Sequence, residues 1–375
     1  MKLQRHGIMA GLALTATLAL AACGSDNNTT PSGSGGASAG AGASGGTGSI
    51  SCATGSLTAQ GSTAQANAMN QWIKAYQTAC SGANITYQGT GSGAGQTAFI
   101  SGTADFAGSD SPFAAADQPK ADKRCGTGPA VHLPMVVGPI AIAYNLTGVT
   151  DLQLKPATLA QIFAGKITKW SDPAIKADNT SATLPDTPIL AVHRSDSSGT
   201  TDNFTKYLAA AAKTDWTYAH DKVWKAPGGS AQKGSDGVGG AVTKTQGAIG
   251  YVEWSYAQVN NLATAKIQNG AGEFTALTGD AAGKTIAGAT VAGTGDDLKL
   301  NIDYNTTASG AYPIVLVSYE IACDKGNKAD KVALLKSFLT YTSSAAAQSS
   351  VTSIGYAPLP DSVRTKVASV VSNLG

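Results

Sequence analysis

The sequence lacks the residue patterns of several common enzyme and metal sites. It contains no GxxxxGK(S/T) loop and no CxxC pair, and no GxSxG serine stands between an expected strand and an expected helix. Its four histidines are scattered, and none stands at metal-ligand spacing from a cysteine or another histidine. These absences argue against a P-loop nucleotide site, a serine hydrolase and a metal site, and we expect no cofactor.

Charge is also scarce, and neither sign dominates. Charged residues make up 13% of the chain, with 26 basic and 24 acidic side chains. Lys2 and Arg5 lie in the N-terminal segment, so the rest of the chain is formally neutral. A neutral surface argues against nucleic acid, or an anionic membrane, as a broad-surface partner.

No apolar run near the N-terminus is long enough for a comfortable membrane span. The run at 7–20 follows Lys2 and Arg5, and the ending at 20–23 (LAAC) resembles a bacterial lipoprotein signal. We therefore expect a signal peptide at 1–22 and a lipid on Cys23, which would anchor the chain to the outer face of the cell membrane. An ordinary secretory signal with a chance cysteine is the alternative, and it also implies export.

The segment that follows Cys23 has too few apolar residues to form a core. Residues 24–49 are almost wholly Gly, Ser, Ala, Thr and Asn, which is typical of a flexible linker. They include a formal GxGxxG at 40–45, but no strand precedes it and no helix follows, so it does not indicate a dinucleotide site. We expect the anchor and linker to occupy 23–51.

The remaining four cysteines are even in number, as expected in an oxidising compartment. Three pairings of Cys52, Cys80, Cys125 and Cys323 are possible. We favour Cys52–Cys80 together with Cys125–Cys323, because a strand followed by a helix folded back on it returns the chain close to where the strand began.

Short apolar runs alternate with helical spacing along most of the chain, which indicates an α/β fold. The expected strands are 57–59, 84–88, 106–108, 188–192 and 313–322, and the expected helices are 66–78, 93–101, 159–164, 201–212, 331–341 and 362–373. Three further segments, 238–243, 249–252 and 255–259, continue a second lobe. The long apolar stretch 131–145 is interrupted by Gly138-Pro139, where we expect one lobe to lead into the next.

Three turns share a design of strand, small or hydroxyl residues, then helix. They are 61–64 (GSTA), 89–93 (GTGSG) and 197–200 (SSGT). The start of a helix offers unpaired N–H groups to an anion, and hydroxyls add donors. Each turn alone could be an ordinary helix cap. Arg194, close to the third turn, has a planar guanidinium whose donors match two oxygens of an oxyanion, and Asp196 is placed to orient it. The alternative role for Arg194 is an ion pair at the surface or between lobes.

The segment 194–201 (RSDSSGTT) resembles the signature loop of the PstS family, the periplasmic substrate-binding proteins of the high-affinity phosphate ABC transporter. Further segments agree in the same order: 87–89 (YQG), 91–92 (GS), 106–110 (FAGSD), 165–170 (GKITKW), 247–253 (GAIGYVE) and 359–363 (LPDSV). The resemblance runs from Leu57 to the C-terminus.

The resemblance implies a set of phosphate contacts, carried over position by position. They are Thr63, the N–H of Ala64, Ser92 and Asp110 from one lobe, and Arg194, Ser198, the N–H of Gly199 and Thr200 from the other. Ala64 replaces a larger residue, which matters little if its N–H alone is used. Ser197 stands where the family often has glycine, and this would strain the loop if the position needs a positive φ.

An aspartate at position 110 predicts selectivity for phosphate over sulfate. Its carboxylate can accept a hydrogen bond from the proton that phosphate keeps near neutral pH, whereas sulfate has no such proton and would face an unpaired charge. The alternative is that Asp110 caps a helix or pairs with Arg194.

The resemblance also implies the architecture: a two-lobed α/β fold of the type II periplasmic-binding-protein (Venus-flytrap) class, hinged by two crossing segments. The lobes are expected at 52–136 plus 314–375 and at 137–313. The expected function is binding of inorganic phosphate by a monomer and its delivery to a membrane permease, without catalysis. A sensor role is compatible with this function.

Two alternatives stay open: a binding protein for sulfate or molybdate, which leaves Asp110 unexplained, and a secreted hydrolase. The hydrolase would need a base near the serines. His193 precedes Arg194 on an expected strand, so its side chain should point to the opposite face.

Overall fold

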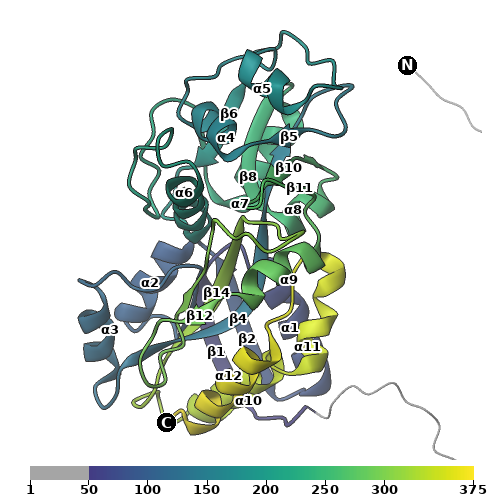
Figure 1. The fold of residues 1–375 in the computed structure, drawn as a ribbon. Helices are drawn as coiled ribbons and strands as arrows, with labels where there is room; N and C mark the ends of the chain where they lie inside the picture. The colour runs from purple at the N-terminus through teal and green to yellow at the C-terminus, as the bar shows by residue number, and fades with distance from the viewer. Residues whose placement is uncertain (1–49) are drawn as a thin grey trace, which may run out of the picture. The chain divides into compact units, whose positions relative to one another are not determined.

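The computed structural model describes residues 50–375 (Figure 1). The signal peptide predicted at 1–22, the lipidation of Cys23 and nearly all of the linker lie outside the described residues. None of the helices within 50–375 is long and apolar enough to cross a membrane.

A nine-stranded sheet runs through both lobes in the order β2-β1-β3-β14-β4-β8-β6-β7, with β9 paired to β4. Its strands are β1 (Gly55–Gly61), β2 (Ala83–Gly89), β3 (Phe106–Ser109), β4 (Ala130–Tyr144), β6 (Leu190–Arg194), β7 (Ser230–Gln232), β8 (Ala248–Glu253), β9 (Ala263–Thr264) and β14 (Val315–Cys323). One small sheet joins β5 (Gln153–Leu154), β10 (Lys266–Gln268) and β11 (Phe274–Thr275). Another pairs β12 (Thr290–Val291) with β13 (Leu300–Asn301).

The fifteen-residue strand β4 connects the two lobes without a break. Its first part, up to Pro139, pairs antiparallel with β14, and from Ile140 onward it pairs with β8. The change of partner falls at the Gly138-Pro139 step that the sequence marked, and the backbone stays extended through it. Every residue of β4 is buried, which explains the long apolar run.

Helices cover both lobes. The first lobe has α1 (Ala66–Ala79), α2 (Ser92–Ile100), α3 (Gln118–Cys125), α10 (Val332–Thr342), α11 (Ala345–Ser350), a short 3-10 turn (Thr352–Ile354) and α12 (Asp361–Asn373). The second has α4 (Pro156–Phe163), α5 (Pro173–Asp178), α6 (Gly199–Ala211), α7 (Gly234–Lys244) and α8 (Trp254–Val259), and α9 (Gly279–Ala287) follows. Each helix and strand expected from the pattern is present, with ends that differ by a few residues.

Each lobe has its own core. In the first, Trp72 and Tyr76 of α1 pack against the C-terminal helices, with the Tyr76 and Phe338 rings 5.4 Å apart, and Figure 1 shows α1 beside α10 and α11. In the second, the rings of Phe163 and Phe204 lie 4.9 Å apart. Residues of α9, among them Ile286, pack in the first core although they lie within 137–313.

Two disulfides confirm the favoured pairing. Cys52, just before β1, is bonded to Cys80 at the end of α1, and Cys125, the last residue of α3, is bonded to Cys323, the last residue of β14. The second bond closes the larger loop, with a separation of 198 residues, so it removes more freedom from the unfolded chain.

Candidate anion-binding site

Two of the three turns chosen from the sequence lie at strand ends that the sheet brings together. β1 and β2 pair in parallel up to Gly61 and Gly89, and β1 and β3 pair up to Gly61 and Gly108. The turns after β1 and β2 are therefore neighbours at one edge of the sheet, and Asp110 follows β3 at the same edge. Parallel strands explain this placement, because their carboxyl ends share an edge.

Asp110 is buried and held by hydroxyl groups. Ser318 donates to its Oδ1 at 2.7 Å, and Ser92 donates to its Oδ2 at 3.1 Å. Burial raises the pKa of Asp110 to about 6, against the lowering effect of bonds from Ser318, Ser62 and Ser92. The side chain does not pair with Arg194 in the described part of the chain, since the guanidinium pairs with Asp196 instead.

Arg194, the last residue of β6, is only 2% exposed. Its Nε and Nη2 donate to the two carboxylate oxygens of Asp196 at 2.7 and 2.6 Å, which confirms that Asp196 orients the guanidinium. Burial by itself lowers the pKa of Arg194, but hydrogen bonds and charge from Asp196 outweigh it and raise the pKa above its ordinary value. The third turn therefore has a fixed, buried positive charge beside it.

The start of α6 meets the first lobe directly. Ser198 is its N-cap and accepts a bond from the N–H of Thr201 at 3.3 Å. The next residue, Gly199, donates its N–H to the hydroxyl of Ser92 at 3.2 Å. A Cβ at Gly199 would lie 2.5 Å from the Cβ of Asp110, so glycine is required here for the close approach of the two lobes.

The remaining predicted contacts, Thr63 and Thr200, lie on opposite sides of one buried polar cluster. Thr63 shares a hydrogen bond of 2.8 Å with Ser235 of α7. Thr200 donates to Glu253, the last residue of β8. The N–H of Ala64 is directed to the hydroxyl of Ser62 at 3.0 Å.

Comparison with known proteins now places the chain. The family model described as the PBP superfamily domain matches residues 38–346. The phosphate-binding protein PstS 3 of Mycobacterium leprae is 43% identical over 99% of both chains. This chain belongs to the PstS family. PstS 2 of Mycobacterium tuberculosis is 41% identical, again over 99% of each chain.

A solved structure of a high-affinity periplasmic phosphate-binding protein bound with phosphate has a TM-score of 0.68 to this PstS-family chain. The two are 22% identical, and the similarity covers 84% of this chain and 93% of the other. It confirms the two-lobed periplasmic-binding-protein fold expected from the sequence.

Two questions left by the sequence are answered by local geometry. Among residues 50–375 the one non-glycine residue with a positive φ is Asn261, so Ser197 does not cause the backbone strain that a positive φ would bring. His193 stacks on Trp224 with ring centroids 4.9 Å apart and bonds to backbone carbonyls of Arg194 and Gly228. As expected, its ring turns away from the guanidinium.

The sequence did not single out Ser235, Glu253 or Ser318 as site residues. Ser235 and Ser318 lie far along the chain from the recognised turns, and single serines carry no signal. Glu253 was quoted only as the last residue of the segment 247–253. Its position at the buried end of β8, where a carboxylate needs partners, is the signal that could have pointed to it.

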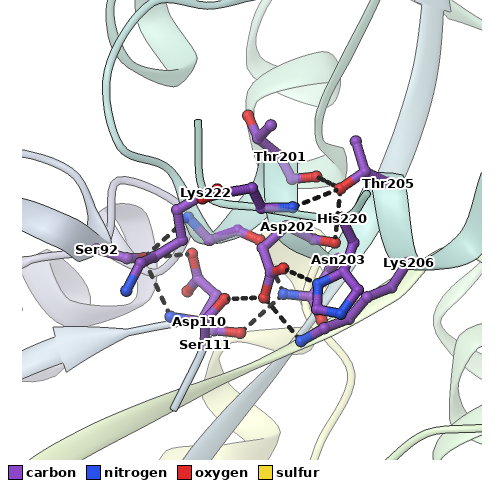
Figure 2. Close-up of polar contacts among 12 residues, drawn as sticks. Ser92, Asp110, Ser111, Thr201, Asp202, Asn203, Thr205, Lys206, His220 and Lys222 are labelled. Carbon is purple, nitrogen blue, oxygen red and sulfur yellow. Dashed lines mark hydrogen bonds and ion pairs between the residues drawn. The ribbon is translucent and has the colours of Figure 1, made fainter. Parts of the chain in front are cut away.

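A second set of bonds joins the lobes beside the site, and Figure 2 shows it around Asp202 of α6. Ser111 of the first lobe donates to Asp202 at 2.6 Å, and His220 and Lys206 each lie 2.7 Å from the same carboxylate. Burial alone would raise the pKa of Asp202, but the bonds from His220, Lys206 and Ser111 and the charge of Lys206 hold it well below its usual range. The carboxylate therefore stays ionised.

Proposed function

We propose that this chain binds inorganic phosphate between its lobes, outside the cytoplasm, and delivers it to the permease of an ABC transporter. One observation supports this above the rest. The N-terminus of α6, beside the buried charge of Arg194, meets Asp110 through Ser92, so donors and one acceptor converge between the lobes. Donors alone would suit any oxyanion, whereas the added acceptor suits one that carries a proton.

The proposed contacts are the eight groups inferred from the resemblance. They are Thr63, the N–H of Ala64, Ser92, Asp110, Arg194, Ser198, the N–H of Gly199 and Thr200. Family membership supports them, and so does the burial of their side chains. Several of these groups bond to neighbouring side chains, and we expect phosphate to take over those bonds.

The proposal also covers the molecule's setting. The lobes are proposed at 52–136 plus 314–375 and at 137–313, with the change of partner along β4 as one crossing and the start of β14 as the other. A monomer held at the membrane by lipid on Cys23 would present both lobes to the permease. Curated relatives are phosphate-binding proteins, which supports a chain that transfers no chemical group.

Calorimetric titration of a soluble form starting at Ile50, stripped of bound anion, tests the function. We expect one-to-one phosphate binding that excess sulfate leaves unchanged. Arg194→Ala should weaken it at least about 100-fold, because several charge-assisted hydrogen bonds are lost. Arg364→Ala on the exposed face of α12, where Arg364 pairs with Asp361, is the matched control and should bind like the parent.

A preference for sulfate or molybdate would contradict the proposal and identify a different oxyanion. Turnover of a phosphomonoester, in an assay from which free phosphate has been removed, would instead support the hydrolase. Absence of binding by the parent chain would leave the buried Arg194 without the role assigned to it.

A further inference from the structure

Ser235, the second residue of α7, touches two of the proposed phosphate contacts. Its side chain is 1% exposed, and its hydroxyl oxygen is 2.8 Å from that of Thr63 and 3.5 Å from Nη1 of Arg194. The same oxygen is 2.5 Å from Oε2 of Glu253. Ser235 therefore touches one contact from the first lobe and one from the second.

Glu253 completes the cluster. Its side chain is fully buried, and its two oxygens accept bonds from two hydroxyls, Thr200 at Oε1 and Ser235 at Oε2. Nη1 of Arg194 lies 3.5 Å from the hydroxyl oxygens of both Thr200 and Ser235. A buried carboxylate that holds two neighbouring hydroxyls fixes both of their orientations at once.

The direction of these bonds follows from the proton count. A hydroxyl has one proton to donate, and the hydroxyls of Thr200 and Ser235 both donate to Glu253. Ser235 and Thr200 each give their proton to Glu253, so Thr63 must be the donor in its bond to Ser235. Both hydroxyls therefore turn their lone pairs toward Thr63 and Arg194, which are the groups expected to hold the anion.

We propose that Ser235 is a further phosphate-contacting residue and that Glu253 is a specificity-determining positioning residue for Ser235 and Thr200; this rests on the proposed function. Phosphate takes the donors of Thr63 and Arg194 for its bare oxygens. The freed lone pairs of Ser235 and Thr200 then accept from a P–OH group. The favoured ligand is thus a doubly protonated oxyanion such as H2PO4⁻. One of its P–OH groups donates a hydrogen bond to Asp110, and the other donates to the pair formed by Ser235 and Thr200.

The test is titration of phosphate, with sulfate as competitor, into the soluble chain and its variants. Ser235→Ala should weaken phosphate binding about 5- to 20-fold, the effect of one lost buried hydrogen bond. Ser343→Ala removes a buried hydroxyl that donates to the carbonyl of Thr340 in the first lobe, and it should bind like the parent.

Glu253→Gln tests the positioning role through selectivity, which a merely structural role would not change. The amide of the Glu253→Gln variant can donate a hydrogen bond to one of the two hydroxyls. That hydroxyl then accepts from the amide and directs its own proton toward the ligand, so that it becomes a donor to the ligand. We expect the preference for phosphate over sulfate to fall at least about 10-fold. Glu320→Gln is the matched control, because it makes the same substitution at another fully buried glutamate, in β14 and outside the proposed contacts.

Unchanged phosphate affinity in Ser235→Ala would overturn the contact, and unchanged selectivity in Glu253→Gln would overturn the positioning role. If Glu253→Gln does not fold, as judged by thermal melting, the sulfate competition of Ser235→Ala decides instead, since it also removes one acceptor. Absence of phosphate binding by the parent would overturn the proposed function and this inference with it, whereas binding by the parent that is unchanged in Ser235→Ala would overturn this inference alone.

Discussion

At the scale of single residues, Asp110 has the most direct link between environment and selectivity. Its pKa of about 6 results mainly from burial, which penalises the charged form. Above pH 6 the group is a carboxylate that accepts a proton-bearing ligand and repels one without a proton. Below pH 6 it becomes a neutral acid, which can donate a hydrogen bond to any oxyanion.

We therefore predict that the rejection of sulfate depends on pH. Sulfate should compete with phosphate at least about 10-fold better at pH 5 than at pH 8, because protonation of Asp110 removes the unpaired charge. Competition calorimetry at the two pH values measures this. Asp110→Asn should tolerate sulfate equally at both, and should lose discrimination more than phosphate affinity. A parent chain that rejects sulfate equally at pH 5 would disprove this role.

At the scale of elements, the start of α6 shows how a helix terminus is brought to a ligand. The turn follows the buried strand β6, is capped by Ser198, and has glycine where the first lobe comes closest. Glycine is needed here because a side chain would not fit between the lobes. The backbone angle does not require it, because Gly199 is not among the residues with positive φ in the described part of the chain.

Gly199→Ala should weaken phosphate binding more than about 10-fold while leaving the melting temperature of the unliganded chain within a few degrees. The added methyl group would lie 2.5 Å from Asp110 and 2.6 Å from the Ser92 hydroxyl, so it blocks closure without affecting either core. Gly240→Ala in α7 is the matched control, since a Cβ there meets nothing within 4 Å. Full affinity in Gly199→Ala would show that the lobes do not need this approach.

At the scale of the whole molecule, several bonds hold the lobes together around the site. Gly93 donates its N–H to the carbonyl of Ser197 at 3.0 Å, and Asn203 donates to the backbone carbonyl of Asp110 at 2.8 Å. The bond from Ser111 to Asp202 involves an ionised acceptor, which makes it stronger than a neutral one. These bonds favour the closed form with or without ligand.

Ser111→Ala should therefore shift the unliganded chain toward an open form. Loss of one charge-assisted bond of about 1.5–3 kcal/mol lowers the ratio of closed to open molecules roughly 10-fold or more, and phosphate affinity falls as the closed fraction falls. Small-angle scattering without phosphate should give a larger radius of gyration than the parent, and saturating phosphate should restore the parental value. Ser343→Ala serves again as control. A variant whose scattering matches the parent in both states would exclude this bond as a determinant of closure.

Local pattern predicted the elements well where it was strong. The buried strands and amphipathic helices such as 66–78 were found, because apolar spacing reports which face is buried. The polar helix α3, short helices such as α5 and α11, and the two-residue strands were not predicted, since they have too few apolar residues or too short a span to give a period.

By itself, the sequence determined the family, the alternation of strands and helices, an even set of four cysteines with one favoured pairing, and the three turns that begin α1, α2 and α6. These depend on neighbours along the chain or on a cysteine count. Only the tertiary structure decided that Ser235 and Glu253 join Thr63, Arg194 and Thr200 in one cluster. Their contacts arise where β6, β8 and α7 meet the turn after β1, and burial there forces each polar group to find a partner.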